Sequence, residues 1–362
     1  MSCFHPLTVR RSFDRLTQKY SSKIVPGVLF EDLDVLNNLP ENRGTFTTYM
    51  HVPCGHCVGC LADRSLQWVA RCSLEQRMSN FTYFVTATFD DDHLPVKDVF
   101  NGRELVPTPV LDKREHQLFL KRFRRRFEYE EKPSPRYFMC GEYGDRTRRP
   151  HFHYLFFMSD PLPDLRPPTL LETGGKRPPP DVMTCDFLRD AWSNGHISVS
   201  SVNPARIAYV CRYTLKKLNA LDERAMADQA RLCRARQLVD QATGEVVGDL
   251  DDYVLPREFI SYSQSIGGSY ADGREFDLAV AGSVPVLVGD KVLTRPLPSS
   301  VVRRIERQIG ENALDVPQSI KNHLKFKQQR ELEGTDLPHY RYLEVKERAF
   351  LDKLKRFPER PI

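Results

Sequence analysis

Two histidines in an apolar segment have the types and spacing to bind a metal. His151 and His153 flank Phe152 in PHFHYLFFM (150–158), a sequence that predicts a β-strand. Because side chains alternate along a strand, both histidines project from one face with a backbone separation of about 6.6–6.8 Å, close enough to bind one metal ion. Phe152 points the other way, into a core.

A carboxylate precedes these histidines. Glu142 ends RYFMCGE (136–142), a second predicted strand. If the two strands pair as a hairpin, Glu142 lies near His151 and supplies an oxygen ligand. Two imidazoles and one carboxylate, with open coordination positions, suit Mg or Mn bound to a phosphate oxygen. A competing source of the third ligand is the cluster Asp90, Asp91, Asp92 and His93, whose alternative interpretation is a polar turn.

Two tyrosines could supply a nucleophile. AYVCRYTLKK places Tyr209 and Tyr213 four residues apart in a predicted helix, so they share a face about 6 Å apart along the axis. Lys216 and Lys217 follow near that face. A phenol of pKa near 10 is only about 0.1% ionised at pH 7, so it needs a nearby lysine or a metal that polarises the phosphate. Alternatively, the tyrosines are packing residues of an amphipathic helix.

A cysteine cluster indicates a second metal site. Cys54, Cys57 and Cys60 form C-x2-C-x2-C, one ligand short of a tetrahedral site. The fourth ligand could be Cys3, His5, His51, His56 or Cys72. We favour Cys3 and structural zinc. An iron–sulfur cluster is disfavoured because Arg64 stands where a fourth cysteine is needed, and reduced thiols remain an alternative.

Basic side chains could contact DNA phosphates. Arg146, Arg148 and Arg149 lie in the loop just before His151, beside the predicted metal site. The segment KRFRRRF (121–127) places basic residues between phenylalanines that recur at helical spacing. It is either a phosphate-contacting face or the solvated side of a helix.

The elements that must position these residues alternate along the chain. Strands are predicted at 83–89, 136–142, 150–158 and 196–202, and helices at 109–127, 185–193 and 204–218. This order is that of an α+β fold with a ferredoxin-like (split βαβ) antiparallel sheet and helices on one face. A helix is also expected after the cysteines, over 61–78, and a hairpin around Gly289 and Asp290.

Composition limits the classes of protein. The 362 residues are 40% hydrophobic and 28% charged, which excludes a wholly disordered chain. No apolar run is long enough for a transmembrane helix, and no signal peptide is recognised, so we expect a soluble intracellular protein. The absence of GxxxxGK[ST] disfavours a P-loop motor. The net charge of +5 is too mild to indicate nucleic acid by itself.

Taken in order, several segments resemble one family. PCGHCVGC, LADRSLQWVARC, YFVTATFDDDHLP, GEYGDRTRRPHFHYLFF and AYVCRYTLKK resemble the HUH-type rolling-circle replication initiators (replication-associated proteins) of gokushovirus-like microviruses. These are small circular single-stranded DNA phages. The resemblance covers about residues 45–220. It extends weakly to REFISYSQSIGG, since SIGGSYA is a loose match.

The resemblance implies a metal-dependent single-strand DNA endonuclease and ligase. His151 and His153 match the family's metal-binding pair, Tyr209 and Tyr213 its two-tyrosine motif, and Lys217 the accompanying lysine. One tyrosine would cut the origin strand, leaving a 5′-phosphotyrosine and a free 3′-OH. The second would cut the regenerated origin after a full circle, so that the displaced strand is closed. Transesterification conserves the phosphodiester energy and needs no ATP.

The same resemblance implies partners and a domain organisation. The expected partners are single-stranded and supercoiled circular phage DNA at the origin, a host helicase and a host DNA polymerase, in the cytoplasm of the bacterial host and without a membrane. The predicted regions are 1–78 with the cysteine cluster, 79–222 as the HUH endonuclease domain, and 223–362 as a mixed C-terminal extension without an assigned role. Two alternatives are an HUH relaxase or transposase and a non-catalytic zinc-bearing single-stranded DNA-binding protein.

Overall fold

The computed structural model divides the chain into two compact units. The first unit contains Met1–Leu66 and Asn312–Ile362, and the second contains Gln67–Glu311. The structure describes residues 3–14, 16–27, 32–39, 47–101, 104–170, 172, 175, 177–216, 237–239, 246–249, 253–288, 291–309 and 334–356. The domain boundaries expected after residues 78 and 222 stay a prediction.

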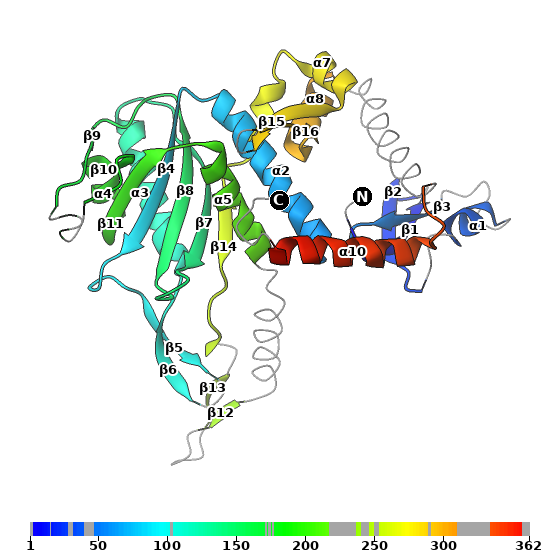
Figure 1. The fold of residues 1–362 in the computed structure, drawn as a ribbon, viewed down its shortest axis with the longest axis horizontal. Coiled ribbons are helices and arrows are strands. Elements are labelled where there is room, and N and C mark those ends of the chain that lie inside the picture. Colours follow the sequence, from blue (N-terminus) through cyan, green and yellow to red (C-terminus); the bar gives the residue numbers. More distant parts are fainter. Residues whose placement is uncertain are drawn as a thin grey trace. The chain divides into compact units, whose positions relative to one another are not determined.

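An antiparallel sheet of seven strands forms the centre of the second unit (Figure 1), in the order β14-β7-β8-β4-β11-β10-β9. Its strands are β4 (Phe81–Phe89), β7 (Arg136–Tyr143), β8 (Pro150–Met158), β9 (Leu165–Arg166), β10 (Val182–Cys185), β11 (Gly195–Ser201) and β14 (Phe259–Tyr262). The α+β class with an antiparallel sheet is therefore confirmed, whereas the ferredoxin-like arrangement stays a prediction. The β8 strand lies between β7 and β4, at the centre of the pairings that matter for the site.

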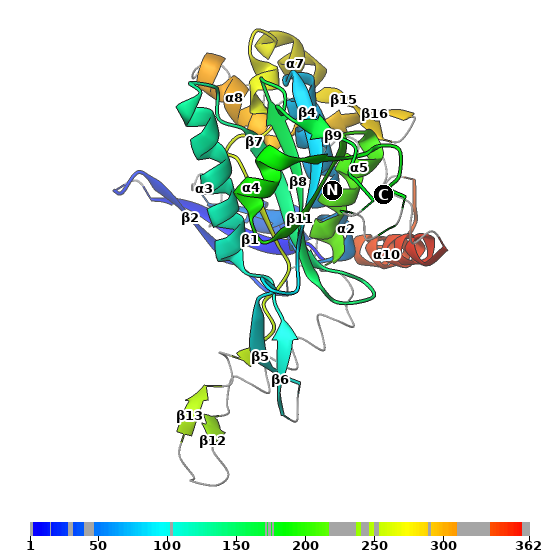
Figure 2. The ribbon, with the colours of Figure 1, turned by 90° about the vertical axis from the view of Figure 1, so that its left-hand side faces the viewer.

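Helices cover both faces of this sheet (Figure 2). On one face, Phe119 of α3 (Lys113–Tyr129) packs against Tyr154 with ring centroids 5.2 Å apart, and α4 (Asp186–Trp192) lies beside α3. On the other face, α5 (Pro204–Lys216) places Tyr209 against His153, and α2 (Val58–Arg77) packs there through its part after residue 66. The expectation of helices on one face is wrong. Both faces of β7 and β8 are buried, so both need a cover.

Aromatic side chains dominate the core under α3 and α4. The predicted row at helical spacing on α3, Phe119, Phe123 and Phe127, is buried in it. The helix begins later than expected, because Asp112 rather than Thr108 accepts the first amide hydrogen bond. Residues 105–109 instead form β6 (Leu105–Pro109), which pairs with β5 (Val96–Phe100). A strand pairing therefore overrides the local helix-start signal.

The described C-terminal part of the second unit is a small mixed layer. Its elements are η2 (Gly268–Ala271), α7 (Glu275–Ala281), β15 (Ser283–Val288), β16 (Lys291–Pro296) and α8 (Ser299–Ile309). The antiparallel pairing of β15 with β16 confirms the predicted hairpin, although its turn at residues 289–290 lies outside the described residues. The segments β12 (Gln237–Val239) and β13 (Val246–Asp249) also pair.

The first unit holds a separate three-stranded sheet in the order β2-β1-β3. Its elements are β1 (Leu7–Asp14), β2 (Lys19–Ile24), α1 (Asp32–Asn38), β3 (Thr47–Val52) and α10 (His339–Arg356). Phe4 packs on Phe350 of α10 at 5.9 Å between ring centroids, and His5 lies 2.8 Å from Glu347, which ties the N-terminal segment to that helix. In the described part of the chain, no helix is long and apolar enough to cross a membrane.

Candidate metal and nucleophile site

The β7–β8 hairpin brings the carboxylate to the histidines. Glu142 is the register partner of His151, as the sequence predicted. The Nε2 atoms of His151 and His153 lie 2.8 Å and 2.9 Å from the same atom, Glu142 Oε1. The alternation of β8 sends Phe152 into the opposite core, so the three ligand candidates share one face of the sheet.

These three groups are largely removed from water. The Glu142 side chain is 3% exposed, and those of His153 and His151 are 9% and 15% exposed. Burial by itself would raise the pKa of Glu142, but hydrogen bonds with His151 and His153 and their charges outweigh it and lower the pKa to about 2. Glu142 is therefore a carboxylate at neutral pH.

Hydrogen bonds behind the imidazoles set their orientation. His151 Nδ1 lies 3.0 Å from the carbonyl oxygen of Arg149, which can only accept, so Nδ1 carries a proton. In neutral His151 the lone pair of Nε2 then points at the ionised carboxylate. His153 Nδ1 lies 2.9 Å from Thr86 Oγ1. Two imidazole nitrogens and a carboxylate oxygen aimed at one point form a donor set that fits a divalent cation.

The competing acidic cluster has other partners. Asp90 accepts from the main-chain amide of His93 at 2.9 Å and lies 2.7 Å from its Nδ1. Asp91 pairs with Arg149 at 2.7 Å. Among the described residues, Glu142 rather than this cluster gathers with the two histidines within metal-ligand reach.

Helix α5 brings one tyrosine to the same oxygen. Asn203 caps the helix by accepting from the amide of Arg206, and Ile207 and Val210 bury its inner side. The Tyr209 hydroxyl consequently donates to Glu142 Oε1 at 3.3 Å, and its ring meets His153 edge-on at 5.4 Å between centroids. Burial raises the pKa of Tyr209, and the charge of Glu142 raises it further.

The other members of the tyrosine motif are placed less fully. Tyr213 and Lys216 belong to α5 by their main chain, one or more turns after Tyr209, and their side chains are outside the described set. Lys217 lies outside the described residues. The structure thus brings Tyr209, but not Tyr213 or Lys217, to the histidines.

The three arginines before β8 differ in surroundings. The guanidinium of Arg149 donates twice to the carbonyl of Phe89, at 3.0 Å and 2.8 Å, and pairs with Asp91, so it fastens the loop to the end of β4. Arg146 and Arg148 are exposed. The Arg148 guanidinium lies 5.1 Å from the ring centroid of Tyr143.

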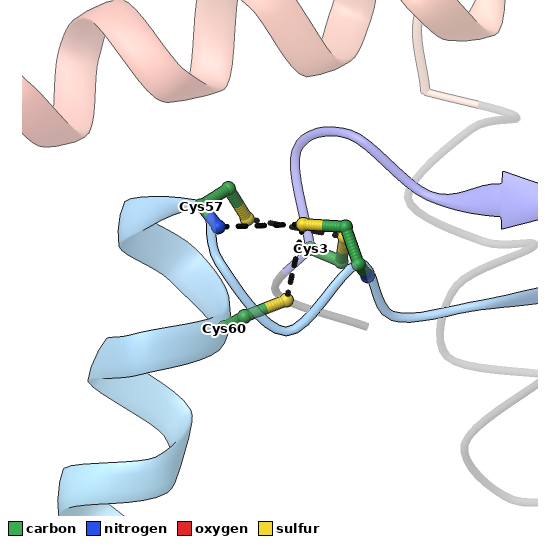
Figure 3. Close-up of side chains that lie close together, drawn as sticks. Cys3, Cys57 and Cys60 are labelled. Atoms are coloured by element: carbon green, nitrogen blue, oxygen red, sulfur yellow. Dashed lines mark hydrogen bonds between the residues drawn. The ribbon is translucent and has the colours of Figure 1, made fainter. Parts of the chain in front are cut away.

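The first unit gathers four cysteines. Figure 3 shows Cys3, from the N-terminal segment, with its sulfur directed toward those of Cys57 and Cys60 at the start of α2. With Cys54 they form one group whose sulfurs all lie within 4.8 Å of one another. Cys3, rather than Cys72, is thus the cysteine that joins the C-x2-C-x2-C segment. Cys72 is buried further along α2 and contacts Cys211.

Main-chain amides point at these sulfurs. The amide of Cys54 donates to Cys3 Sγ at 3.2 Å, that of Phe4 to Cys57 Sγ at 3.3 Å, and that of Cys57 to Cys54 Sγ at 3.3 Å. Burial opposes ionisation of Cys57, yet these hydrogen bonds lower its pKa to about 7, whereas burial raises the pKa of Cys3 to about 11. Four sulfurs supported by amide donors are the environment of thiolates bound to zinc.

Sequence reasoning missed two residues that support the site. Thr86 holds His153 through its Nδ1, and Phe84 stacks on the His153 ring at 5.3 Å between centroids. Both lie on β4, on the face that carries the histidines. The alternation in YFVTATF indicates that Phe84 and Thr86 share a face. The signal that was lacking is which strand lies beside β8.

Comparisons with known proteins bear on the same segment. Residues 82–218 match the family model of the ORF2 type of replication-associated protein. This segment belongs with the phage replication-associated proteins. Replication-associated protein VP4 of Bdellovibrio phage phiMH2K is 32% identical over 171 residues, which cover 46% of this chain and 48% of that protein. The predicted resemblance to phage replication-associated proteins is confirmed.

Two further phage proteins are similar. Replication-associated protein ORF2 of Spiroplasma virus 4 is 32% identical over 176 residues, 48% of this chain and 51% of that protein. Replication-associated protein ORF4 of Chlamydia phage 1 is 28% identical over 166 residues, 46% of this chain and 38% of that protein. The matches therefore span about half of these relatives or less. No solved structure matches the chain.

Proposed function

We propose that this protein nicks and rejoins one strand of a small circular phage DNA, and so initiates and terminates its rolling-circle replication. One observation carries the proposal: Glu142 Oε1 lies 2.8 Å and 2.9 Å from the two histidine Nε2 atoms and 3.3 Å from the Tyr209 hydroxyl. A metal-ligand set and a nucleophile thus meet at one point. The relationship to phage replication-associated proteins supports a role in phage replication.

Glu142, His151 and His153 would hold the cation, with Mg or Mn as the natural choices for a phosphate substrate. When bound, this cation supplies a Lewis acid at the scissile phosphate and offsets negative charge there. The chain supplies the rigid support. Thr86 and the carbonyl of Arg149 fix the two imidazoles from behind.

Tyr209 is the proposed nucleophile. Its oxygen attacks the phosphorus, a tyrosyl O–P bond forms, and the bond from phosphorus to the 3′ oxygen breaks, which leaves a 5′-phosphotyrosine and a 3′-OH. The phenol proton leaves through the hydrogen bond to Glu142 and the 3′ oxygen takes up a proton, so the reaction is balanced. Rejoining is the reverse reaction. Tyr213 is proposed as the second nucleophile, with Lys217 as the accompanying lysine.

The remaining residues have supporting roles in this proposal. Arg146 and Arg148, exposed in the loop before β8, bind phosphates beside the cut, together with Lys216. Arg149 holds that loop in place. Cys3, Cys54, Cys57 and Cys60 bind a structural zinc. The reaction takes place on single-stranded or supercoiled DNA in the host cytoplasm, and a host helicase and DNA polymerase complete replication.

The test is formation of a covalent adduct on circular single-stranded phage DNA with Mg or Mn. Wild type is compared with Tyr209→Phe, Tyr213→Phe, the double variant and His151→Ala. Tyr209→Phe removes the hydroxyl and keeps the ring that packs on His153. Tyr262→Phe is the matched control, because this partly exposed tyrosine lies on β14 and not at the metal ligands.

We expect an SDS-resistant protein–DNA band that requires the metal and is lost in the double variant and in His151→Ala. Tyr262→Phe should form the band at the wild-type level. A band that survives the double variant would mean that the nucleophile lies elsewhere. Salt-sensitive DNA binding without any band, in every variant, would favour a non-catalytic single-stranded DNA-binding protein.

A further inference from the structure

Helix α3 divides its basic side chains between two sides. Arg122 and Arg126 donate to main-chain carbonyls of α4 at 2.6–3.2 Å, so these two arginines hold the fold together. The opposite side forms a stripe at spacings of three and four residues: Lys113, Gln117, Lys121, Arg124 and Glu128. The basic segment of α3 is therefore neither wholly structural nor wholly solvated.

This stripe faces a groove along β14, the edge strand of the sheet. The groove has a volume of about 790 Å³ and runs between α3 and residues 259–261. Beyond Arg124 and Tyr137, a second hollow of about 510 Å³ continues it to Gln264. Six extended residues, 259–264, correspond to about 20 Å. The two hollows share Arg124 and Tyr137 and form one track along the sheet edge.

The track combines cations with aromatic rings. Lys113, Lys121, Arg124 and Arg125 line it against the single carboxylate of Glu128. The Nε–H group of Arg124 is buried and has no acceptor among the described residues. The Arg124 guanidinium lies 5.2 Å from the Tyr137 ring centroid, and Lys113 Nζ lies 5.4 Å from that of Phe259. An anionic ligand would supply the acceptor that this arginine lacks.

The track is separate from the candidate nicking site. Tyr137 and Phe259 pack with the core under α3. His151 and His153 project from the other face of the sheet, under α5. A strand bound in the track would therefore not occupy the metal ligands.

We propose that the groove between α3 and β14 binds the backbone of single-stranded DNA, away from the nicking site. Rows of cations interleaved with aromatic rings bind such strands without sequence preference, because phosphates meet the cations and bases stack on the rings. An acidic peptide would use the cations or the open edge of β14, but it would leave the rings without a role. The proposal needs no cleavage activity.

The experiment measures binding of a labelled oligo(dT) in EDTA, so that neither metal nor an origin sequence contributes. The test variant is Lys121→Gln/Arg125→Gln on α3, where both side chains are exposed. The control is Arg303→Gln/Arg307→Gln on α8, which removes the same charge from another exposed helix. Affinity is measured at several salt concentrations, and thermal melting checks that each variant is folded.

Each phosphate contact on a single strand contributes about 0.7 to the slope of log K against log salt. Loss of two contacts should lower the slope by about 1.4, which corresponds to about 25-fold weaker binding at 0.1 M salt relative to 1 M. The control should retain the wild-type slope. An equal loss in the control, or an unchanged slope in the test variant, would refute the proposal. So would displacement of a labelled poly-glutamate, but not of oligo(dT), by the test substitutions.

Discussion

Gly267 is the position where a single methyl group should test how the loop after β14 is held against α2. Its φ is +75°, and a Cβ built there would lie 2.6 Å from the carbonyl oxygen of Arg71 in α2. Its amide also donates at 2.6 Å to Glu75, which is buried and pairs with Arg136. Gly267→Ala therefore adds backbone strain and a clash with main-chain atoms that cannot rotate away.

The expected cost is the sum of two effects. The left-handed conformation costs about 1–2 kcal/mol for a residue with a Cβ. Moving the loop away from α2 weakens the hydrogen bond to the buried Glu75 carboxylate, worth about 1.5–3 kcal/mol. We expect Gly267→Ala to lower the free energy of unfolding by about 3–5 kcal/mol. Gly273→Ala is the matched control, because Gly273 has a φ of +74° but no atom within 4 Å of its built Cβ.

Urea denaturation followed by tryptophan fluorescence measures both variants. The chain has two tryptophans, Trp68 and Trp192, and both are buried in the second unit. Trp68 lies 4.3 Å from Tyr262 between ring centroids, so it reports on the packing of α2 against β14. The control should lose only about 1–2 kcal/mol. Equal losses in the two variants would refute the close approach of the loop to α2.

Four further outcomes follow from the site and the core. Glu142→Gln should weaken Mn²⁺ binding at least about 10-fold in calorimetry, and unchanged affinity would remove Glu142 from the ligand set. Cys3→Ser should reduce the zinc content measured by mass spectrometry and lower the melting temperature, whereas full zinc retention would contradict a four-cysteine site. Burial, and then the charge of Arg124, lower the pKa of His116 to about 4. Because the unfolded chain binds this proton from about pH 6.5 downwards, stability should fall by up to about 3 kcal/mol between pH 6.5 and 4, and His116→Gln should flatten that part of the profile. Arg149→Ala should lower the melting temperature, whereas Arg146→Ala should weaken DNA binding at an unchanged melting temperature; the reverse pattern would refute the roles assigned to this loop.

Local sequence patterns predicted much of the second unit. The β7 and β8 strands are rich in apolar and aromatic residues, and their predicted bounds are matched to within one residue. The Glu142 and His151 pairing followed from the short turn between them. The three strands of the first unit were missed, because β2 is exposed throughout and has no alternation between apolar and polar residues.

Helix limits were less predictable where tertiary pairing competes with local signals. Thr108 and Pro109 look like a helix start, but the β5–β6 pairing takes them and leaves the cap to Asp112. The cover on both faces of the sheet was missed for a related reason. Whether a helix packs above or below a sheet depends on the whole set of apolar faces, which a single segment does not reveal.

The sequence by itself determined the chemistry available to this protein: two histidines on one face of a strand, a carboxylate on the preceding strand, tyrosines on one helix face, and a run of cysteines with one ligand missing. Alternation and helical periodicity are local, so these relations could be read without a structure. Only the tertiary structure decided what meets what. It brought Tyr209 to the oxygen that also meets His151 and His153, and it added Cys3 from 51 residues away to Cys54. It also divided the basic residues of α3 between core and groove. Such contacts depend on how several elements pack together, and no single segment encodes that packing.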